Sequence, residues 1–125
     1  MKLYIGGSLT DFKYIRNLAI ELKKGVHSID YEWWEFVDYF TEEDVKSSLA
    51  LSTYKAICDC EAYILVPSRS YKAMDYQFEL GVVYRLGRKV YLLQDKEGWK
   101  DSIFHYLPNI KVLTREELKK ELCQI

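Results

Sequence analysis

Hydrophobic residues recur along the chain with two spacings, and the two kinds of segment alternate. Apolar or alternating runs predict five strands, over residues 2–5, 26–34, 62–66, 88–93 and 110–113. Apolar positions at helical spacing predict intervening helices, over about 12–24, 41–58, 73–86 and 114–123. The third run, AYILV at 62–66, is uninterrupted, which is typical of a strand covered on both faces, and Pro67 ends it.

This alternation predicts a single α/β domain over residues 1–125. Strands that alternate with helices favour a parallel sheet with helices on both faces. We expect a flavodoxin-like or Rossmann-like three-layer sandwich whose five-stranded, mainly parallel sheet has the order 2-1-3-4-5. Ligands in such folds bind beyond the carboxyl ends of the strands, where the strand order reverses. The candidate functional residues therefore lie in the segments that follow strands 1, 2, 3 and 4.

One acidic residue breaks the apolar pattern of the third helix. Glu79 shares a helical stripe with Tyr76, Val82, Val83 and Leu86. If Asp75 caps the helix, Glu79 lies in or just after the first turn, near the ligand-binding edge of the sheet. An acid near a helix N-terminus gains at most about 1 kcal/mol from the macrodipole, whereas burial of an ionised carboxylate costs several kcal/mol without partners. A catalytic role and a buried structural partner both remain open on this pattern.

Composition and motifs exclude several function classes. The chain has 18 basic and 19 acidic residues and a net charge of -1, so we expect no nucleic-acid polymer and no anionic membrane as a partner. No apolar run approaches the length of about 18 residues that a membrane span needs, and the protein is expected to be cytoplasmic with reduced cysteines. P-loop and dinucleotide fingerprints are absent, and no metal site or cofactor is expected.

Three segments resemble the nucleoside 2-deoxyribosyltransferase-like superfamily. They are KLYIGGS at 2–8, CEAYILV at 60–66 and FELGVVYRLGRKVYLL at 78–93, and the late SIFHYLPNIKVLTREEL at 102–118 is similar to the tail of short members. The resemblance implies a substrate that is a small nucleoside or nucleotide. It also implies cleavage of the N-glycosidic bond, or deoxyribosyl transfer, through a covalent glycosyl intermediate on Glu79.

The resemblance also suggests the other residues of the site. Tyr4 and Asp75 are the further catalytic candidates, Tyr4 to position the carboxylate or the sugar and Asp75 to assist the departing base. The substrate-binding candidates are small or aromatic residues in the loops after the strands: Gly6, Gly7, Ser8, Trp33, Trp34 and Ser68. Either tryptophan of the pair is suited to stacking on a nucleobase, or to the core.

The chain departs from the family pattern at two acidic positions. Family transferases carry an Asp where this chain has Thr53, and a second Asp where it has Ala73, although Asp75 lies close to the second. A non-catalytic nucleotide-binding or sensor module of the same fold is therefore an alternative function. An NAD glycohydrolase similar to TIR domains is another, because such enzymes also use a Glu on a helix beside a similar sheet.

Self-association is expected as well. The second helix carries SSLALSTY at 47–54, a run of small and apolar residues suited to pairing. Members of the superfamily form dimers or larger assemblies, so the resemblance implies a homodimer or a higher homo-oligomer.

Overall fold

The computed structural model describes residues 1–67, 75–94 and 103–123. Its five strands are β1 (Lys2–Gly6), β2 (Ser28–Ile29), β3 (Ala62–Leu65), β4 (Lys89–Leu93) and β5 (Ile110–Leu113). Its α-helices are α1 (Phe12–Leu22), α2 (Glu43–Asp59), α3 (Asp75–Arg85) and α4 (Arg115–Cys123). Three 3₁₀ helices join them: η1 (Leu9–Asp11), η2 (Trp33–Tyr39) and η3 (Ile103–Tyr106).

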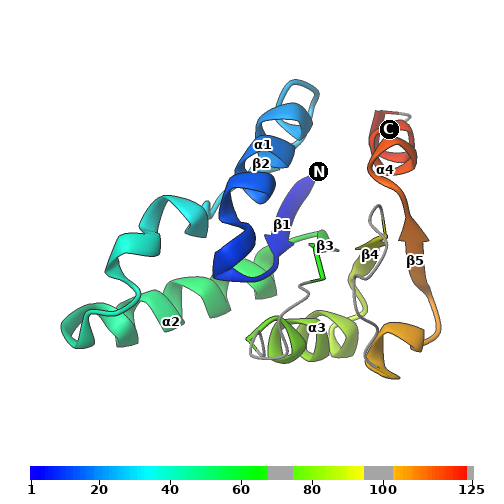
Figure 1. Cartoon of the computed structure of the whole chain (residues 1–125). Helices are drawn as coiled ribbons and strands as arrows, with labels where there is room; N and C mark the ends of the chain where they lie inside the picture. The colour runs from blue at the N-terminus through cyan, green and yellow to red at the C-terminus, as the bar shows by residue number, and fades with distance from the viewer. Residues whose placement is uncertain (68–74, 95–102, 124–125) are drawn as a thin grey trace.

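The five strands form one parallel sheet in the order β2-β1-β3-β4-β5, which confirms the predicted order. Helices α1 and α4 cover one face, and α2 and α3 cover the other (Figure 1). The predicted three-layer α/β sandwich is therefore confirmed. In this order the chain reverses direction across the sheet between β1 and β3, so the crevice expected for ligands opens there.

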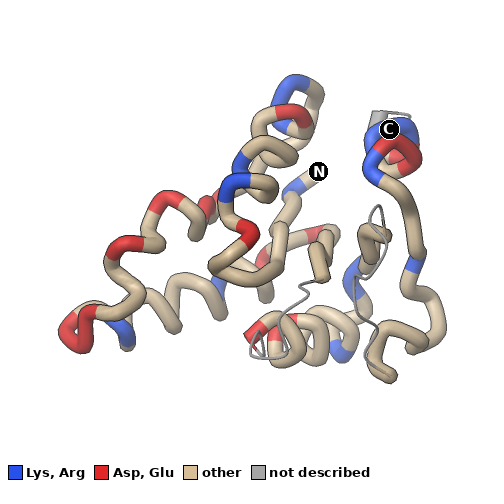
Figure 2. Tube along the Cα trace, viewed as in Figure 1, with Lys and Arg blue, Asp and Glu red and all other residues tan. Residues whose placement is uncertain are grey.

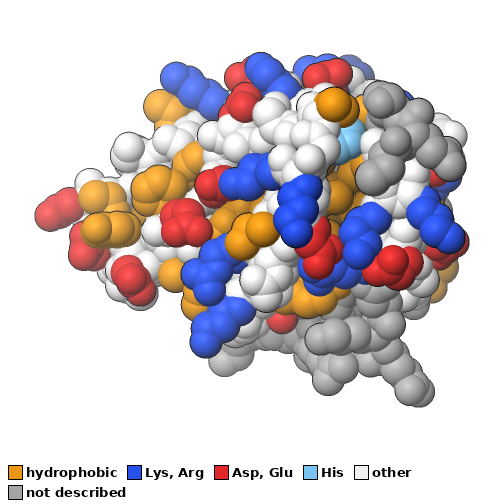
Figure 3. Space-filling model, turned by 90° about the horizontal axis from the view of Figure 1, so that it is seen from above, with side chains coloured by type: hydrophobic (Ala, Val, Ile, Leu, Met, Phe, Trp, Pro, Cys, Tyr) orange, Lys and Arg blue, Asp and Glu red, His pale blue; other side chains and the backbone are white. Residues whose placement is uncertain are grey.

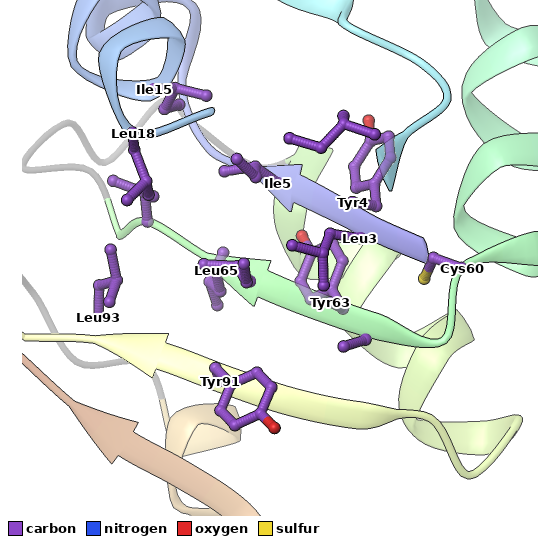
Figure 4. Packing of buried hydrophobic residues seen from close by; sticks show 14 of the residues in the cluster. Leu3, Tyr4, Ile5, Ile15, Leu18, Cys60, Tyr63, Leu65, Tyr91 and Leu93 are labelled. Carbon is purple, nitrogen blue, oxygen red and sulfur yellow. The ribbon is translucent and has the colours of Figure 1, made fainter. Parts of the chain in front are cut away.

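The centre of the sheet is buried on both sides. Every residue of β3 is buried, and the four residues of β1 that follow Lys2 are buried too. Side chains of β1, β3 and β4 pack together with residues of α1 in one hydrophobic core (Figure 4). This packing agrees with the uninterrupted apolar run at 62–66, because a strand with helices above and below it has no face for polar residues.

The second strand is much shorter than predicted. Only Ser28 and Ile29 pair with β1, and the prediction of a strand over 26–34 is wrong beyond them. The aromatic residues of that run instead begin η2. The physical reason is burial by packing: Trp33 and Trp34 are both buried, and they meet edge to face with ring centroids 5.7 Å apart. Aromatic residues that are typical of a strand can therefore be buried equally well from a 3₁₀ helix.

Helix ends follow the sequence signals closely in the second half of the chain. Gly87 has a φ of 73°, and the N–H groups of Gly87 and Arg88 donate to the carbonyls of Tyr84 and Val83. These bonds make a Schellman motif that ends α3, in the left-handed conformation that glycine adopts without strain. α4 begins with a capping box, in which the Thr114 N–H donates to Glu117 and the Glu117 N–H donates to the Thr114 hydroxyl.

The outer face of α1 and α4 is a solvated, ion-paired surface. Viewed from that side, acidic and basic side chains alternate over it (Figure 3). Glu21 of α1 accepts from Arg115 of α4 at 3.1 Å and lies 3.4 Å from Lys119. Elsewhere, acidic residues gather on η2 and at the beginning of α2 (Figure 2). In the part of the chain that the structure describes, no helix has the length and apolar character needed to cross a bilayer.

Candidate active site

Glu79 lies at the inner side of α3, against the carboxyl half of the sheet. The helix begins at Asp75, which places Glu79 just beyond its first turn, and the side chain is 8% exposed. Its carboxylate makes no salt bridge with any residue that the structure describes. A buried acid without a cationic partner is stable only if other groups supply hydrogen bonds.

Two tyrosine hydroxyls supply those hydrogen bonds. Tyr4 of β1 donates to Oε2 of Glu79 at 3.2 Å, and Tyr63 of β3 donates to Oε1 at 2.9 Å. The two tyrosines are register partners on neighbouring strands, so their side chains leave the sheet on the same face. Their rings stack with centroids 5.8 Å apart and planes within 8° (Figure 4). Each oxygen of the carboxylate thus has its own donor.

Burial sets the ionisation of this group. The pKa of Glu79 is raised from 4.5 to about 7: removal from water raises it most, the hydrogen bonds from Tyr63 and Tyr4 lower it, and the negative charge of Asp75 adds to the rise. The pKa values of Tyr4 and Tyr63 are raised well above the usual 10, by burial first and by the neighbouring Glu79 second. Both phenols therefore stay protonated and remain donors, while Glu79 titrates near neutral pH.

A pocket of about 620 Å³ opens beside the carboxylate. Its lining residues come from β1, η1, η2, α2 and the first part of α3, and include Tyr4 and Glu79. The wall is mostly apolar with a few polar groups, as expected for a small-molecule site. The pocket thus lies beside β1 and the segment that follows it, and Glu79 faces it.

The tryptophan pair divides between the pocket and the core. Trp33 lines the pocket, and its indole N–H donates to the carbonyl of Ile5 at 2.7 Å, which fixes the ring. Trp34 is not among the lining residues and packs edge-on against Trp33, with 3% of its surface exposed. Both rings are buried, and Trp33 is the one of the pair that lines the pocket.

The segment after β1 also divides. Gly7 and Ser8 line the pocket, whereas Gly6 does not. The Ser8 hydroxyl accepts from the backbone N–H of Thr10 at 3.3 Å and caps η1, so it has a structural role as well. A Cβ atom added to Gly6 would lie 2.0 Å from Oη of Tyr63 and 2.7 Å from Oε1 of Glu79. Gly6 therefore makes room for the Tyr63–Glu79 pair beneath the pocket.

Asp75, the other acidic candidate, is exposed and lines the pocket near Glu79. Thr53, at the position where the resemblance calls for an acid, also lines the pocket and brings a neutral hydroxyl. Ser68 and Ala73 lie outside the described residues.

Sequence reasoning missed two residues of this site. Tyr63 was hidden in an apolar strand, and the only available signal was a tyrosine beside Tyr4 in the expected sheet. Lys46 of α2 is the one cation among the described residues that line the pocket, and it pairs with Glu43 at 3.1 Å. Within the described ranges, no cluster of three or more His, Cys, Asp or Glu side chains is arranged to hold a metal ion.

The fold and the site together define a three-layer α/β domain with the strand order 2-1-3-4-5 and a buried carboxylate that faces a pocket beside β1. Among solved structures, the chain is similar to the CMP N-glycosidase BcmB of Clostridium botulinum. The TM-score is 0.62 at 20% sequence identity, over 98% of this chain and 97% of that one. No protein-family model and no curated protein sequence matches the chain significantly.

Proposed function

We propose that this protein cleaves the N-glycosidic bond of a nucleoside or nucleotide, or transfers its sugar to a second base, with Glu79 as the nucleophile. One observation carries the proposal: Glu79 is buried with no cationic partner among the described residues, yet it faces a pocket of about 620 Å³ and a hydrogen bond orients each of its two oxygens. Such an arrangement is costly for stability, and enzymes commonly retain unfavourable burial where a carboxylate must react.

The reaction divides into two displacements. The Glu79 carboxylate attacks C1′ of the sugar, and the C1′–N bond breaks with its electron pair passing to the base. The base takes a proton from pocket water or from Asp75, which lines the same pocket. Water, or a second base, then attacks C1′ of the glycosyl ester, loses a proton, and returns Glu79 to its carboxylate form.

Three observations support a nucleoside or nucleotide as substrate. The fold is shared with a protein described as a CMP N-glycosidase. Trp33 presents a fixed indole at the pocket wall for a base. Lys46 brings a positive charge to the same pocket, which suits an anionic substrate.

The first experiment measures release of free base by chromatography. The substrate panel contains CMP, deoxynucleosides, their 5′-monophosphates and NAD, so that the last also tests the NAD glycohydrolase alternative. We expect release from at least one nucleoside or nucleotide, and its loss in Glu79→Ala. Release that survives this substitution would refute Glu79 as the nucleophile. A second free base added to the reaction distinguishes transfer from hydrolysis, because transfer alone produces a new nucleoside.

A covalent intermediate has its own test. A 2′-fluoro substrate slows both displacements, because fluorine destabilises the positive charge that develops on the sugar. The intact mass of the protein is then expected to rise by one glycosyl group, located on the peptide that contains Glu79. An unchanged mass during turnover of that substrate would count against the ester.

A non-catalytic binding module is the second candidate function, and Thr53 favours it. This residue lines the pocket from α2 with a hydroxyl, in place of the carboxyl group that could transfer a proton to the departing base. Calorimetric titration separates the two functions: a nucleotide that binds and is recovered intact after long incubation supports the sensor. Turnover of the bound nucleotide supports the enzyme.

We also propose that the protein self-associates through α2. Of its 17 residues only Ile57 is buried, while Leu51 and Tyr54 are 56% and 48% exposed. Tyr54 also lines the pocket, so a copy seated on α2 would cover the pocket wall. Light scattering should give a mass above the 14.9 kDa of one chain. Leu51→Gln should lower that mass, whereas Ile20→Gln, at an exposed position of α1, should leave it unchanged.

A further inference from the structure

Tyr63 has a place in the site that the proposed reaction does not yet use. It is fully buried on β3, and it is not among the residues that line the pocket. Its hydroxyl donates to Oε1 of Glu79 at 2.9 Å and lies 3.5 Å from the carbonyl of Tyr76. A polar group at the centre of a three-layer core costs free energy unless it is paired, so this contact is the reason that a tyrosine is tolerated there.

We propose that Tyr63 is a positioning residue for Glu79: it holds Oε1 beneath the pocket floor and leaves Oε2 to attack the sugar. The inference rests on the proposed function, and it assigns different tasks to the two carboxylate oxygens. Oε2 is bonded to Tyr4, which lines the pocket, whereas Oε1 is bonded to a residue that substrate does not reach.

The backbone beside Tyr63 is adapted to this contact. A Cβ atom on Gly6 would approach Oη of Tyr63 to 2.0 Å and Oε1 of Glu79 to 2.7 Å, far inside van der Waals distance. Only glycine at this position leaves space for both groups. Gly6 on β1, Tyr63 on β3 and Glu79 on α3 therefore fit one another. Their combination is explained if the Tyr63 hydroxyl must contact the Glu79 carboxylate.

The proposal is consistent with the bond changes of the reaction. When Oε2 forms its bond to C1′, the C1′–N pair leaves with the base, which takes its proton from water or Asp75. The Oε2 acceptor of Tyr4 then becomes an ester oxygen and a weak acceptor. Oε1 becomes the ester carbonyl oxygen, which still accepts from Tyr63. The Tyr63 contact therefore persists through both displacements, and it keeps the side chain in place while the bond to the sugar forms and breaks.

Tyr63 also contributes to the charge state of Glu79. Among the described residues, six titratable groups surround this carboxylate or share its pocket: Tyr4 from β1, Tyr63 from β3, Asp75 and Tyr76 from α3, and Lys46 and Tyr54 from α2. Among them the Tyr63 hydrogen bond is the largest influence that lowers the pKa of Glu79 against the effect of burial. Its loss should leave more of the carboxylate protonated, and thus unreactive, at neutral pH.

The test compares Tyr63→Phe with Tyr4→Phe and Tyr91→Phe in the full chain. Tyr91 is a buried tyrosine of β4 that does not line the pocket, so Tyr91→Phe is a matched control. Two quantities are measured: kcat and KM for base release over pH 5 to 9, and the titration of Glu79 by carbon-13 NMR of labelled glutamate carboxyls. Glu79→Gln identifies the resonance.

We expect Tyr63→Phe to raise the pKa of Glu79, to move the acidic limb of the kcat profile to higher pH by the same amount, and to leave KM nearly unchanged. Because Tyr63→Phe removes a hydrogen bond to a charged group, we expect kcat at pH 6 to fall about tenfold to hundredfold. Tyr4→Phe should change KM as well, because Tyr4 touches the pocket. Tyr91→Phe should change neither quantity.

An unchanged Glu79 titration and an unchanged pH profile in an active Tyr63→Phe protein would overturn the proposal, as would a loss expressed in KM alone. If this variant does not fold, 3-fluorotyrosine at position 63 tests the same contact. Its phenol is a stronger hydrogen-bond donor, so it should lower the pKa of Glu79. An unchanged pKa of Glu79 in that protein would also overturn the proposal. If the wild type releases no base from any substrate while Tyr63→Phe shifts the Glu79 titration, the proposed function fails and the contact is supported.

Discussion

Replacement of Glu79 by Gln should make the protein more stable, by an amount that grows with pH. Glutamine keeps the size and shape of the side chain and offers an oxygen and an NH₂ group to the two tyrosine hydroxyls. It removes the charge, and its NH₂ group donates where a carboxylate oxygen accepted, so one tyrosine hydroxyl must accept instead of donate. The pH dependence of the difference in folding free energy between the two proteins therefore isolates the cost of an ionised group at a site that is 8% exposed.

The magnitude follows from the pKa of Glu79 in the two states. The pKa is about 7 in the folded protein and 4.5 in the unfolded chain, so the folded state binds more protons between these values. Stability of the wild type is then lost as pH rises from about 4.5 through about 7, and the full penalty is present above the folded pKa. Linkage gives a penalty of about 1 kcal/mol at pH 5, about 2 kcal/mol at pH 6 and about 3 kcal/mol at pH 8.

The measurement is urea unfolding of both proteins at pH 5, 6, 7 and 8, followed by circular dichroism. The informative quantity is the slope of the stability difference with pH, because a constant offset reports only the packing of the amide. Glu35→Gln, at an exposed position of η2, is the matched control and should give a difference that stays within about 0.5 kcal/mol at every pH. A stability difference for Glu79→Gln that is flat from pH 5 to 8 would refute the burial of an ionised carboxylate.

Other consequences are measurable on the same protein. The kcat/KM for base release should fall about tenfold for each pH unit below about 7, because only ionised Glu79 is a nucleophile; a profile level down to pH 5 would contradict this. Trp33→Leu should raise KM about tenfold through loss of stacking, whereas Trp34→Leu should lower thermal stability with little effect on KM, and the reverse pattern would exchange their roles. Gly6→Ala should destabilise the protein by about 3 kcal/mol in denaturant unfolding, since its Cβ would overlap Tyr63 and Glu79. Gly87→Ala should lower stability by about 1 kcal/mol through its φ of 73° and leave kcat/KM unchanged, so a loss of activity there would be unexpected.

The charge state of Glu79 links function to stability in this protein. At pH 7 a group with a pKa of about 7 is close to half ionised, so a large part of the population carries the ionised form that the proposed reaction needs. A fully exposed glutamate would be ionised throughout, but water would compete for its lone pairs. Burial beside the pocket leaves the Glu79 side chain 8% exposed, and the two tyrosines limit how far its pKa rises. The destabilisation expected in unfolding experiments is thus the counterpart of the reactivity that we propose for Glu79.

Much of this architecture was determined by local sequence pattern. The alternation of strand and helix periods, with the doubly buried run at 62–66, was enough to predict a parallel sheet covered on both faces, and the flavodoxin-like order expected for it is the observed one. Gly87 and the Thr114–Glu117 pair marked helix ends because their signals act within a few residues of chain. Glu79 stood out for the same reason: a charge on an apolar stripe is visible without knowledge of its partners.

Only the tertiary structure decided how the carboxylate is held. Tyr63 is 16 residues from Glu79 and Tyr4 is 75, and the parallel pairing of β1 with β3, with α3 laid across them, brings all three together. A strand buried on both faces gives no polar alternation, so Tyr63 reads as one more core residue. Gly6 reads as a place for ligand approach, although the space it leaves is filled by this hydroxyl. Periodicity reports which side chains are buried, whereas the identity of their neighbours depends on contacts between elements that are distant in the chain.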